Sequence, residues 1–264
     1  MDDMQRMGTR SNSIAMPRTQ NRLVLLLEKN WRILAEILFI VPAYAAYQLV
    51  RSAVGGQAGT AFDNATRLIQ LEKRLGIFHE ASLQQYVLPR DWMVDAANYI
   101  YIYGHLPVII MVAFWLYVRH RDNYALFRNA FLISGLIALI GFTTMPLAPP
   151  RYMPEFGFVD TIVNAQSYYV FQNPKIVNQY AAMPSLHFGW DLLVAVAIGV
   201  CTSKRWVRYV AFVLPAFTLS GIVLTANHYF LDAVAGALVA GVGLGIALLL
   251  RRVIRRESVF SFLT

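Results

Sequence analysis

Charged residues are scarce in this chain of 264 residues, and their scarcity excludes most soluble folds. Only 14% of the residues are Asp, Glu, Lys or Arg, whereas a soluble domain carries about 25%. Hydrophobic residues make up 57%, and the mean hydropathy is +0.47. We therefore predict an all-α polytopic membrane protein, because a chain of this length holds several apolar spans of about 20 residues each.

Cysteine is almost absent as well. Cys201 is the only one, which excludes an intrachain disulfide. The net charge of +8 would suggest nucleic acid as the partner of a soluble protein. Here the basic residues flank apolar runs, so their role in orienting the chain in a bilayer explains them better, and we expect no nucleic-acid partner.

Six apolar runs are long enough to cross a bilayer, and together they predict six transmembrane helices. We expect these spans at about 31–50, 94–118, 124–145, 184–201, 207–224 and 228–250. The predicted organisation is a basic tail, one membrane domain and a second tail, at residues 1–30, 31–250 and 251–264.

The first loop carries two shorter patterns, at 62–75 and 81–88, that are amphipathic. We expect both to be helices that rest at the membrane interface in the first outer loop. The leucines expected on the apolar side of the first are Leu68, Leu71 and Leu75.

The basic residues predict the orientation of the spans. Most of the 23 lysines and arginines lie in the two tails, the second-to-third loop and the fourth-to-fifth loop. With six spans, all four segments fall on one side, which is then cytoplasmic. We expect an integral protein of the plasma membrane with both termini inside. Arg151, His187 and His228 then meet at the extracytoplasmic boundary.

His228 and Asp232 are four residues apart, at the start of the last apolar run. On a helix this spacing lets the carboxylate accept a hydrogen bond from one ring nitrogen of the histidine. The other ring nitrogen is then available as a nucleophile or a base. A carboxylate one turn inside an apolar helix also needs such a partner, because an unpaired charge there costs roughly 3 kcal/mol.

Pro184-Ser185-Leu186-His187 opens another helix, whose first N–H groups and positive dipole end form an anion site. Ser185 can donate a hydroxyl hydrogen there, and Arg151 can bind an oxyanion with two parallel hydrogen bonds. His187 can protonate a leaving group. This inventory fits phosphoryl transfer through a phosphohistidine, with no metal or other cofactor required.

Four motifs resemble those of the type-2 phosphatidic acid phosphatase superfamily, membrane enzymes that act on lipid phosphates. The resemblance covers roughly residues 60–250 and is closest to the inositol phosphorylceramide synthase branch. The motifs are Pro149-Pro150-Arg151, Gly157-Phe158-Val159-Asp160-Thr161, Ala182-Met183-Pro184-Ser185-Leu186-His187 and His228-Tyr229-Phe230-Leu231-Asp232.

The resemblance implies that His228 is the nucleophile, Asp232 the group that orients it and His187 the general acid. It also implies that Arg151 and Ser185 bind phosphate and that a lipid in the bilayer is the substrate. Thr144, Leu186 and Ile222 stand where phosphatases of the family carry lysine, glycine and arginine. With two cations fewer, the site suits a phosphodiester or a transferase, unless Lys175 and another basic residue fill in.

Other readings remain open for several residues. Asp191 either orients His187 or pairs within the helix bundle, and His105 is interpreted as a polar contact between helices. We assign no physical role to Asp160. The alternative function is a proton-coupled transporter or channel that uses the His and Asp residues as a relay. Against it, these residues cluster at one boundary, and there is no internal repeat.

Overall fold

The computed structural model describes residues 18–53, 57–162 and 178–260, so Lys175 lies outside the described residues. The chain divides into two compact units, Met1–Ala45 and Ala46–Thr264. The described part is helical, with no strand and one isolated bridge between Leu147 and Ala181. The elements are α1 (Arg18–Ala53), α2 (Ala58–Leu75), α3 (Glu80–Val87), α4 (Asp91–Tyr103), α5 (His105–Arg119), α6 (Arg121–Thr144), η1 (Pro150–Tyr152), η2 (Pro154–Phe156), α8 (Leu186–Cys201), α9 (Arg205–Leu224) and α10 (Phe230–Phe260).

The first unit contains most of α1. Its apolar side chains, such as Leu38 and Phe39, are not covered by other parts of the protein. The candidate span Ile33–Val50, which continues into the second unit, has 0% of its residues buried. An apolar helix with this exposure requires lipid around it, and it lies where the sequence predicts the first span.

Four described helices are long and apolar enough to cross a membrane. They contain Ile33–Val50, Arg121–Thr144, Arg205–Leu224 and Phe230–Ile254. The pair α4 and α5 raises the number to 5 if it is counted as one bent span, while α8 is apolar but has only 16 residues. All six expected spans therefore correspond to apolar helices, of which four or five meet the length criterion.

The predicted continuous span at 94–118 is wrong in one respect, because the helix breaks at Gly104. The axes of α4 and α5 differ by 43° at this break. A Cβ atom on Gly104 would lie 2.5 Å from the carbonyl oxygen of Ile100, so the close approach of the backbone requires glycine. The break makes His105 the first residue of α5.

Two further helix boundaries differ from the prediction. Helix α8 begins at Leu186, which leaves Ser185 as its N-cap residue instead of an internal one. Helix α10 continues to Phe260, beyond the expected end at Leu250. Arginines extend the helix past the apolar run because they are good helix formers.

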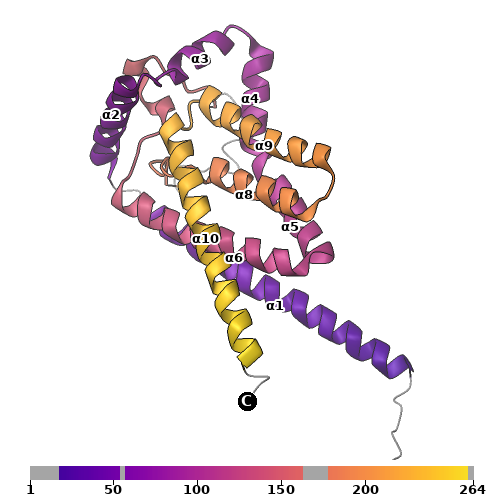
Figure 1. The fold of residues 1–264 in the computed structure, drawn as a ribbon. Helices are drawn as coiled ribbons and strands as arrows, with labels where there is room; N and C mark the ends of the chain where they lie inside the picture. The colour runs from indigo at the N-terminus through magenta and orange to yellow at the C-terminus, as the bar shows by residue number, and fades with distance from the viewer. Residues whose placement is uncertain (1–17, 54–56, 163–177, 261–264) are drawn as a thin grey trace, which may run out of the picture. The chain divides into compact units, whose positions relative to one another are not determined.

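Helix α8 lies at the centre of the second unit and packs against α5, α6, α9 and α10 (Figure 1). Its crossing with α10 brings two backbones together without side chains between them. A Cβ atom on Gly236 would collide with the carbonyl oxygen of Ser185, and one on Gly189 would collide with that of Gly236. Small residues permit such close approach of membrane helices. Gly236 of α10 therefore serves close helix packing.

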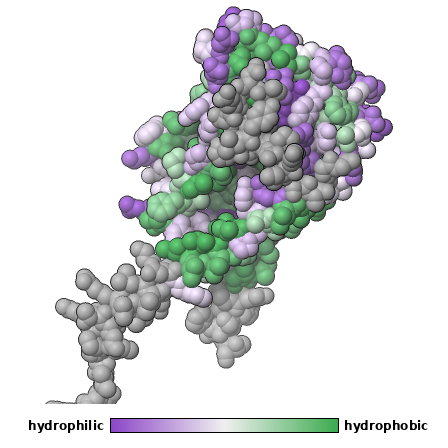
Figure 2. Space-filling view, turned by 180° about the vertical axis from the view of Figure 1, so that it is seen from behind, coloured by the Kyte–Doolittle hydropathy of each residue, from purple (hydrophilic) through white to green (hydrophobic). Residues whose placement is uncertain are grey.

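The second unit exposes many large apolar side chains on its outer helix faces, among them Phe114, Phe217 and Leu238. Figure 2 shows that hydrophobic residues cover much of the lower part of one face, whereas hydrophilic ones gather toward the other end. A soluble protein rarely exposes contiguous apolar surface on this scale, so the distribution is that of a protein embedded in lipid.

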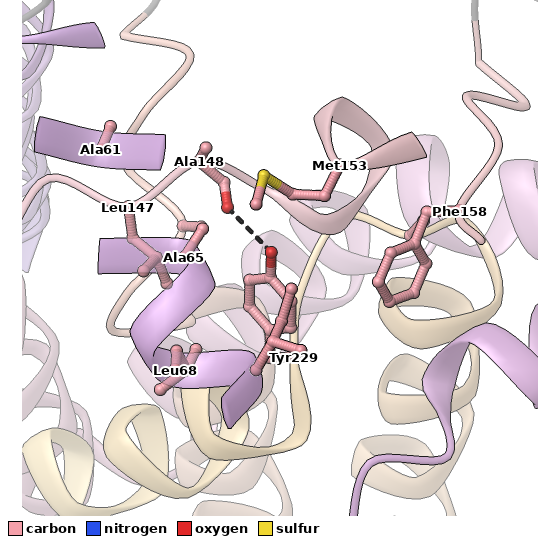
Figure 3. Packing of buried hydrophobic residues seen from close by; sticks show 11 residues of the cluster. Ala61, Ala65, Leu68, Leu147, Ala148, Met153, Phe158 and Tyr229 are labelled. Atoms are coloured by element: carbon pink, nitrogen blue, oxygen red, sulfur yellow. Dashed lines mark hydrogen bonds between the residues drawn. The ribbon is translucent and has the colours of Figure 1, made fainter. Parts of the chain in front are cut away.

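Both patterns of the first loop form helices, α2 and α3, and the small side chains of α2 make most of its contacts with the protein. Leu68 is buried, whereas Leu71 and Leu75 are 46% and 57% exposed. The buried side packs on the segments around Leu147 and Tyr229, forming one core cluster (Figure 3). Besides Leu68, that side carries Ala61, Ala65, Ile69 and Glu72.

The glycine crossing yields the first prediction. Gly236→Ala should lower the thermal stability of the purified protein and its activity, since overpacking at a buried contact costs about 1–3 kcal/mol. Gly241→Ala is the matched control on the same helix, because its Cβ atom would meet nothing within 4 Å. Thermal unfolding in detergent measures both. Equal melting temperatures for the two variants would contradict the close backbone contact of α8 and α10 at Gly236.

Candidate active site

A tight turn between α9 and α10 carries His228. The backbone N–H groups of Asn227 and His228 both donate to the carbonyl oxygen of Ile222, at 2.9 and 3.1 Å. Ala226 has a φ of +53°, a left-handed conformation that a residue other than glycine rarely adopts. Such strained positions concentrate at functional sites, and this one orients the backbone that leads into His228.

His228 and Asp232 form the couple that their spacing predicts. Nδ1 of His228 lies 3.3 Å from Oδ2 of Asp232, and the N–H of Tyr229 donates to the same oxygen at 3.0 Å. The carboxylate is fully buried, and the histidine side chain is only 7% exposed. This geometry holds the proton of His228 on Nδ1 and leaves Nε2 as the nitrogen with a lone pair.

The start of α8 lies directly against this couple. The backbone N–H of Ser185 donates to the carbonyl oxygen of Asp232 at 2.9 Å. The hydroxyl of Ser185 is fully buried and has no hydrogen-bond partner among the described residues. A buried hydroxyl that caps neither its own helix nor a neighbour is available to a ligand at the positive end of α8.

His187 faces His228 across the site, with ring centroids 5.6 Å apart. Two other rings surround it, those of Tyr101 and His105, with centroids at 5.0 and 4.8 Å. The two histidines that the sequence places at separate helix starts therefore lie side by side. A phosphate bound against both rings would have a nitrogen nucleophile on one and a proton donor on the other.

The backbone of Arg151 is joined to the turn that carries His228. Its N–H donates to the carbonyl oxygen of Ala226 at 2.7 Å, which joins the first motif to the turn of His228. Nearby, the hydroxyl of Tyr229 donates to the carbonyl oxygen of Ala148 at 3.3 Å (Figure 3). These two bonds hold the buried Arg151 beside the start of α10.

The guanidinium of Arg151 has several polar neighbours. Its Nε lies 3.8 Å from a carboxylate oxygen of Asp160, and its Nη2 donates to the hydroxyl of Tyr152 at 3.4 Å. That hydroxyl in turn lies 3.3 Å from Oε1 of Gln179. Asp160, to which the sequence alone gave no role, thus balances the charge of Arg151 and helps to orient it.

Two buried glutamates contact the start of α10, and sequence analysis missed both. An oxygen of Glu72 accepts the N–H of Leu231 at 2.9 Å, and an oxygen of Glu80 accepts that of Phe230 at 2.9 Å. Both side chains are fully buried. They satisfy two donors at the positive end of the helix that carries Asp232, so α2 and α3 hold the catalytic helix in place.

The signal for Glu72 was present in the helical spacing. Ala61, Ala65, Leu68 and Glu72 follow one another at intervals of three and four residues, so the carboxylate lies on the small apolar side of α2. The sequence analysis considered only the leucines of this helix and did not assign a side to Glu72. Glu80 gave no comparable signal, because it lies in a short helix with little periodicity.

Burial next to other acids changes the acidity of Glu72. Desolvation, a hydrogen bond with Glu80 and the charges of Glu80 and Asp232 raise the pKa of Glu72 from 4.5 to about 9, against the opposing effect of the Leu231 N–H. Glu72 is therefore protonated near neutral pH and donates to Glu80. The same burial raises the pKa of the neighbouring Tyr229 far above its usual range.

Asp191 resolves one of the open alternatives. Although it lies one turn after His187, its carboxylate accepts hydrogen bonds from Nδ1 of His105, at 2.9 Å, and from the hydroxyl of Thr218. The prediction that His105 makes a polar contact between helices is thus confirmed. The sequence could not pair these residues, because they come from three helices.

The fold and the site define a class of protein: a helical membrane protein whose buried histidine–carboxylate couple faces a second histidine at the start of an apolar helix. Comparisons with known proteins agree. The model of the PAP2 superfamily matches residues 66–246, and the chain belongs to this superfamily. It is an integral membrane protein.

The chain is also similar to a curated bacterial protein. The chain is 28% identical over 191 residues to a phosphoinositol dihydroceramide synthase of Bacteroides thetaiotaomicron. The match covers 64% of this chain and 62% of the relative. No solved structure matches the chain.

The raised pKa of Glu72 yields the second prediction. Between about pH 4.5 and pH 9 only the unfolded chain releases this proton, so the free energy of unfolding falls as the pH rises. Glu72→Gln can still accept the Leu231 N–H and donate to Glu80, but it cannot ionise. We expect its melting temperature to decline less with pH than that of the wild type.

Melting temperatures measured in detergent at a series of pH values in this range test the prediction. Glu155→Gln, at an exposed glutamate of the outer segment, is the control and should follow the wild type. If Glu72→Gln declines in parallel with the wild type, Glu72 does not hold a proton in the folded protein.

Proposed function

We propose that the protein is a lipid phosphatase or phosphotransferase that works through a phosphohistidine on His228. The observation that carries this proposal is the pair of histidines 5.6 Å apart, one of them hydrogen-bonded to the buried Asp232. Membership of the PAP2 superfamily supports the same chemistry. No observation favours the alternative of a transporter or channel.

In the first step, Nε2 of His228 attacks the phosphorus of the lipid, forming an N–P bond while the P–O bond to the lipid alcohol breaks. Asp232 accepts the hydrogen bond of Nδ1–H and so stabilises the positive charge that develops on the ring. His187 gives its proton to the departing alkoxide. Ser185 and the start of α8 provide donors for the phosphoryl oxygens, whose charge increases in the transition state.

In the second step, an acceptor hydroxyl attacks the phosphohistidine, the N–P bond breaks, and His187 takes the hydroxyl proton. Water as acceptor gives a phosphatase, and a lipid or polyol alcohol gives a transferase. The name of the curated relative favours a transferase that moves a phosphoinositol group to a ceramide-like alcohol. Thr144 and Ile222 in place of cations point the same way, because a phosphodiester carries less charge than a monoester.

Arg151 and Ser185 are the proposed phosphate-binding residues, with Lys175 as a further candidate. Asp160 and Tyr152 orient the guanidinium of Arg151, and the backbone N–H of Arg151 ties the residue to the turn of His228. A single buried arginine suits one phosphodiester anion better than a dianionic monoester.

We further propose that the chain crosses the plasma membrane six times as one domain, residues 31–250, with the tails inside. Contacts support this topology. Arg251 lies 3.9 Å from Asp122, and Asn123 donates to Sγ of Cys201 at 3.1 Å. The start of α6, the end of α8 and the end of the apolar part of α10 therefore lie at one end of the bundle. His187 and His228 lie at the starts of α8 and α10, at the other, proposed extracytoplasmic end.

The third prediction concerns this orientation. A cysteine introduced at the exposed Ser82 of α3 should react with a membrane-impermeant maleimide on intact cells, in a Cys201→Ser background. A cysteine at the exposed Lys204, in the loop between α8 and α9, should react only after the cells are opened. Labelling in the reverse order would place the site on the cytoplasmic face.

The fourth prediction tests the reaction. His228→Ala and Asp232→Asn should abolish turnover, by about 10³-fold or more, because a nucleophile and its orienting group act as a unit. His120→Ala, remote from the site, is the control. Activity is followed as phosphorus-containing products of phosphatidic acid, an isoprenyl phosphate, and phosphatidylinositol with and without ceramide.

The products decide between the two activities. Orthophosphate released by the wild type but not by His228→Ala means a phosphatase. A new phosphodiester that forms only with ceramide means a transferase. Full activity of folded His228→Ala would refute the phosphohistidine.

A further inference from the structure

A second histidine–carboxylate couple lies behind the proposed general acid. His105, the first residue of α5, binds Asp191 of α8 through Nδ1, and Asp191 also accepts the hydroxyl hydrogen of Thr218 from α9. Asp191 is fully buried and the side chain of His105 is 13% exposed. Both carboxylate oxygens are thus used, and the His105 ring has a fixed orientation.

The ring of His105 lies between two others. It stacks on Trp190, with ring planes 11° apart and centroids at 6.1 Å, and it contacts His187 at a centroid distance of 4.8 Å. Trp190 is itself anchored, because its Nε1 donates to the hydroxyl of Ser134 in α6 at 3.0 Å. His187 therefore packs against a ring that α6, α8 and α9 together hold in place.

Helix packing alone does not require this arrangement. A buried ion pair is weak evidence for stability, since apolar side chains of similar volume are often as good. In a membrane span, an ionisable residue is costly and marks a functional site by default. The break at Gly104 supports a functional role for this pair, because it makes His105 the first residue of α5 and places it opposite Asp191.

We propose that His105, held by Asp191 and Thr218, is a positioning residue for His187. It keeps the ring of His187 in the orientation from which its proton reaches the leaving oxygen of the lipid. The inference rests on the proposed function, in which His187 protonates a departing alkoxide. Tyr101, His105 and His228 are the titratable side chains that contact the ring of His187 in the described residues.

Leaving-group chemistry separates this role from a structural one. The alkoxide of diacylglycerol is a poor leaving group and needs a proton, whereas 4-nitrophenolate leaves without one. Loss of proton delivery should therefore slow phosphatidylinositol turnover. It should spare the burst of 4-nitrophenolate released when inositol 4-nitrophenyl phosphate, which carries the same headgroup, forms the phosphohistidine. A general structural defect would slow both substrates alike, and loss of the nucleophile would abolish both.

The variant to measure is His105→Gln, which keeps a donor for Asp191 and so avoids an unpaired buried carboxylate. We expect its kcat on phosphatidylinositol with ceramide to fall by about 10²-fold, with KM almost unchanged, because general acid catalysis contributes about 10²–10⁴-fold. Its burst of 4-nitrophenolate from inositol 4-nitrophenyl phosphate should keep the wild-type rate, as should that of His187→Ala, because the first step on this substrate needs no proton from His187. Thr218→Val, which loosens Asp191 from the other side, should show the same selectivity to a smaller degree.

His120→Gln is the matched control and should leave both activities unchanged, since the ring of His120 contacts Trp115, away from the site. Equal losses of His105→Gln on both substrates, or no loss on either, would overturn this inference and leave the proposed function intact. Activity of His228→Ala on either substrate, or no turnover by the wild type, would instead refute the proposed function.

Discussion

The burial of one carboxylate, that of Asp232, organises the rest of this structure. An ion in apolar surroundings requires donors that point at it, and the chain supplies them from the turn that precedes α10: the N–H of Tyr229 and Nδ1 of His228. The donors restrict the backbone of this turn, including the left-handed Ala226. The contacts that satisfy the buried carboxylate consequently also fix the orientation of the His228 ring.

The surrounding elements stabilise the start of α10 from every side. Glu72 and Glu80 accept its first N–H groups, Ser185 donates to the carbonyl oxygen of Asp232, and Arg151 is joined to the turn through Ala226. The glycine crossing of α8 and α10 permits this, because a methyl group on Gly236 would push Ser185 away. Segments far apart in sequence thus meet through backbone hydrogen bonds, which are insensitive to the identity of most side chains.

Histidine is paired with aspartate twice, and the two couples differ in burial and partners. His228–Asp232 lies within one helix start, whereas His105–Asp191 joins α5 to α8 and is reinforced by Thr218 of α9. His187 contacts the histidine rings of both couples, with centroid distances of 4.8 Å to His105 and 5.6 Å to His228.

The sequence by itself determined the all-α membrane class, the positions of the apolar helices and the couple of His228 with Asp232. The class and the helix positions depend on composition and apolar run length. The couple depends on a separation of four residues, which brings the turn before α10 against the first turn of that helix. The family resemblance also followed from motifs that can be read in the chain.

Only the tertiary structure decided which residues from different helices meet. Asp191 could have bonded to His187 in its own helix, but it bonds to His105 and Thr218 because α5 bends at Gly104 and α9 packs alongside. Glu72 could have faced water, but the small side chains of α2 pack inward and carry it to α10. Contacts of this kind depend on the relative placement of helices, which periodicity along one chain does not encode.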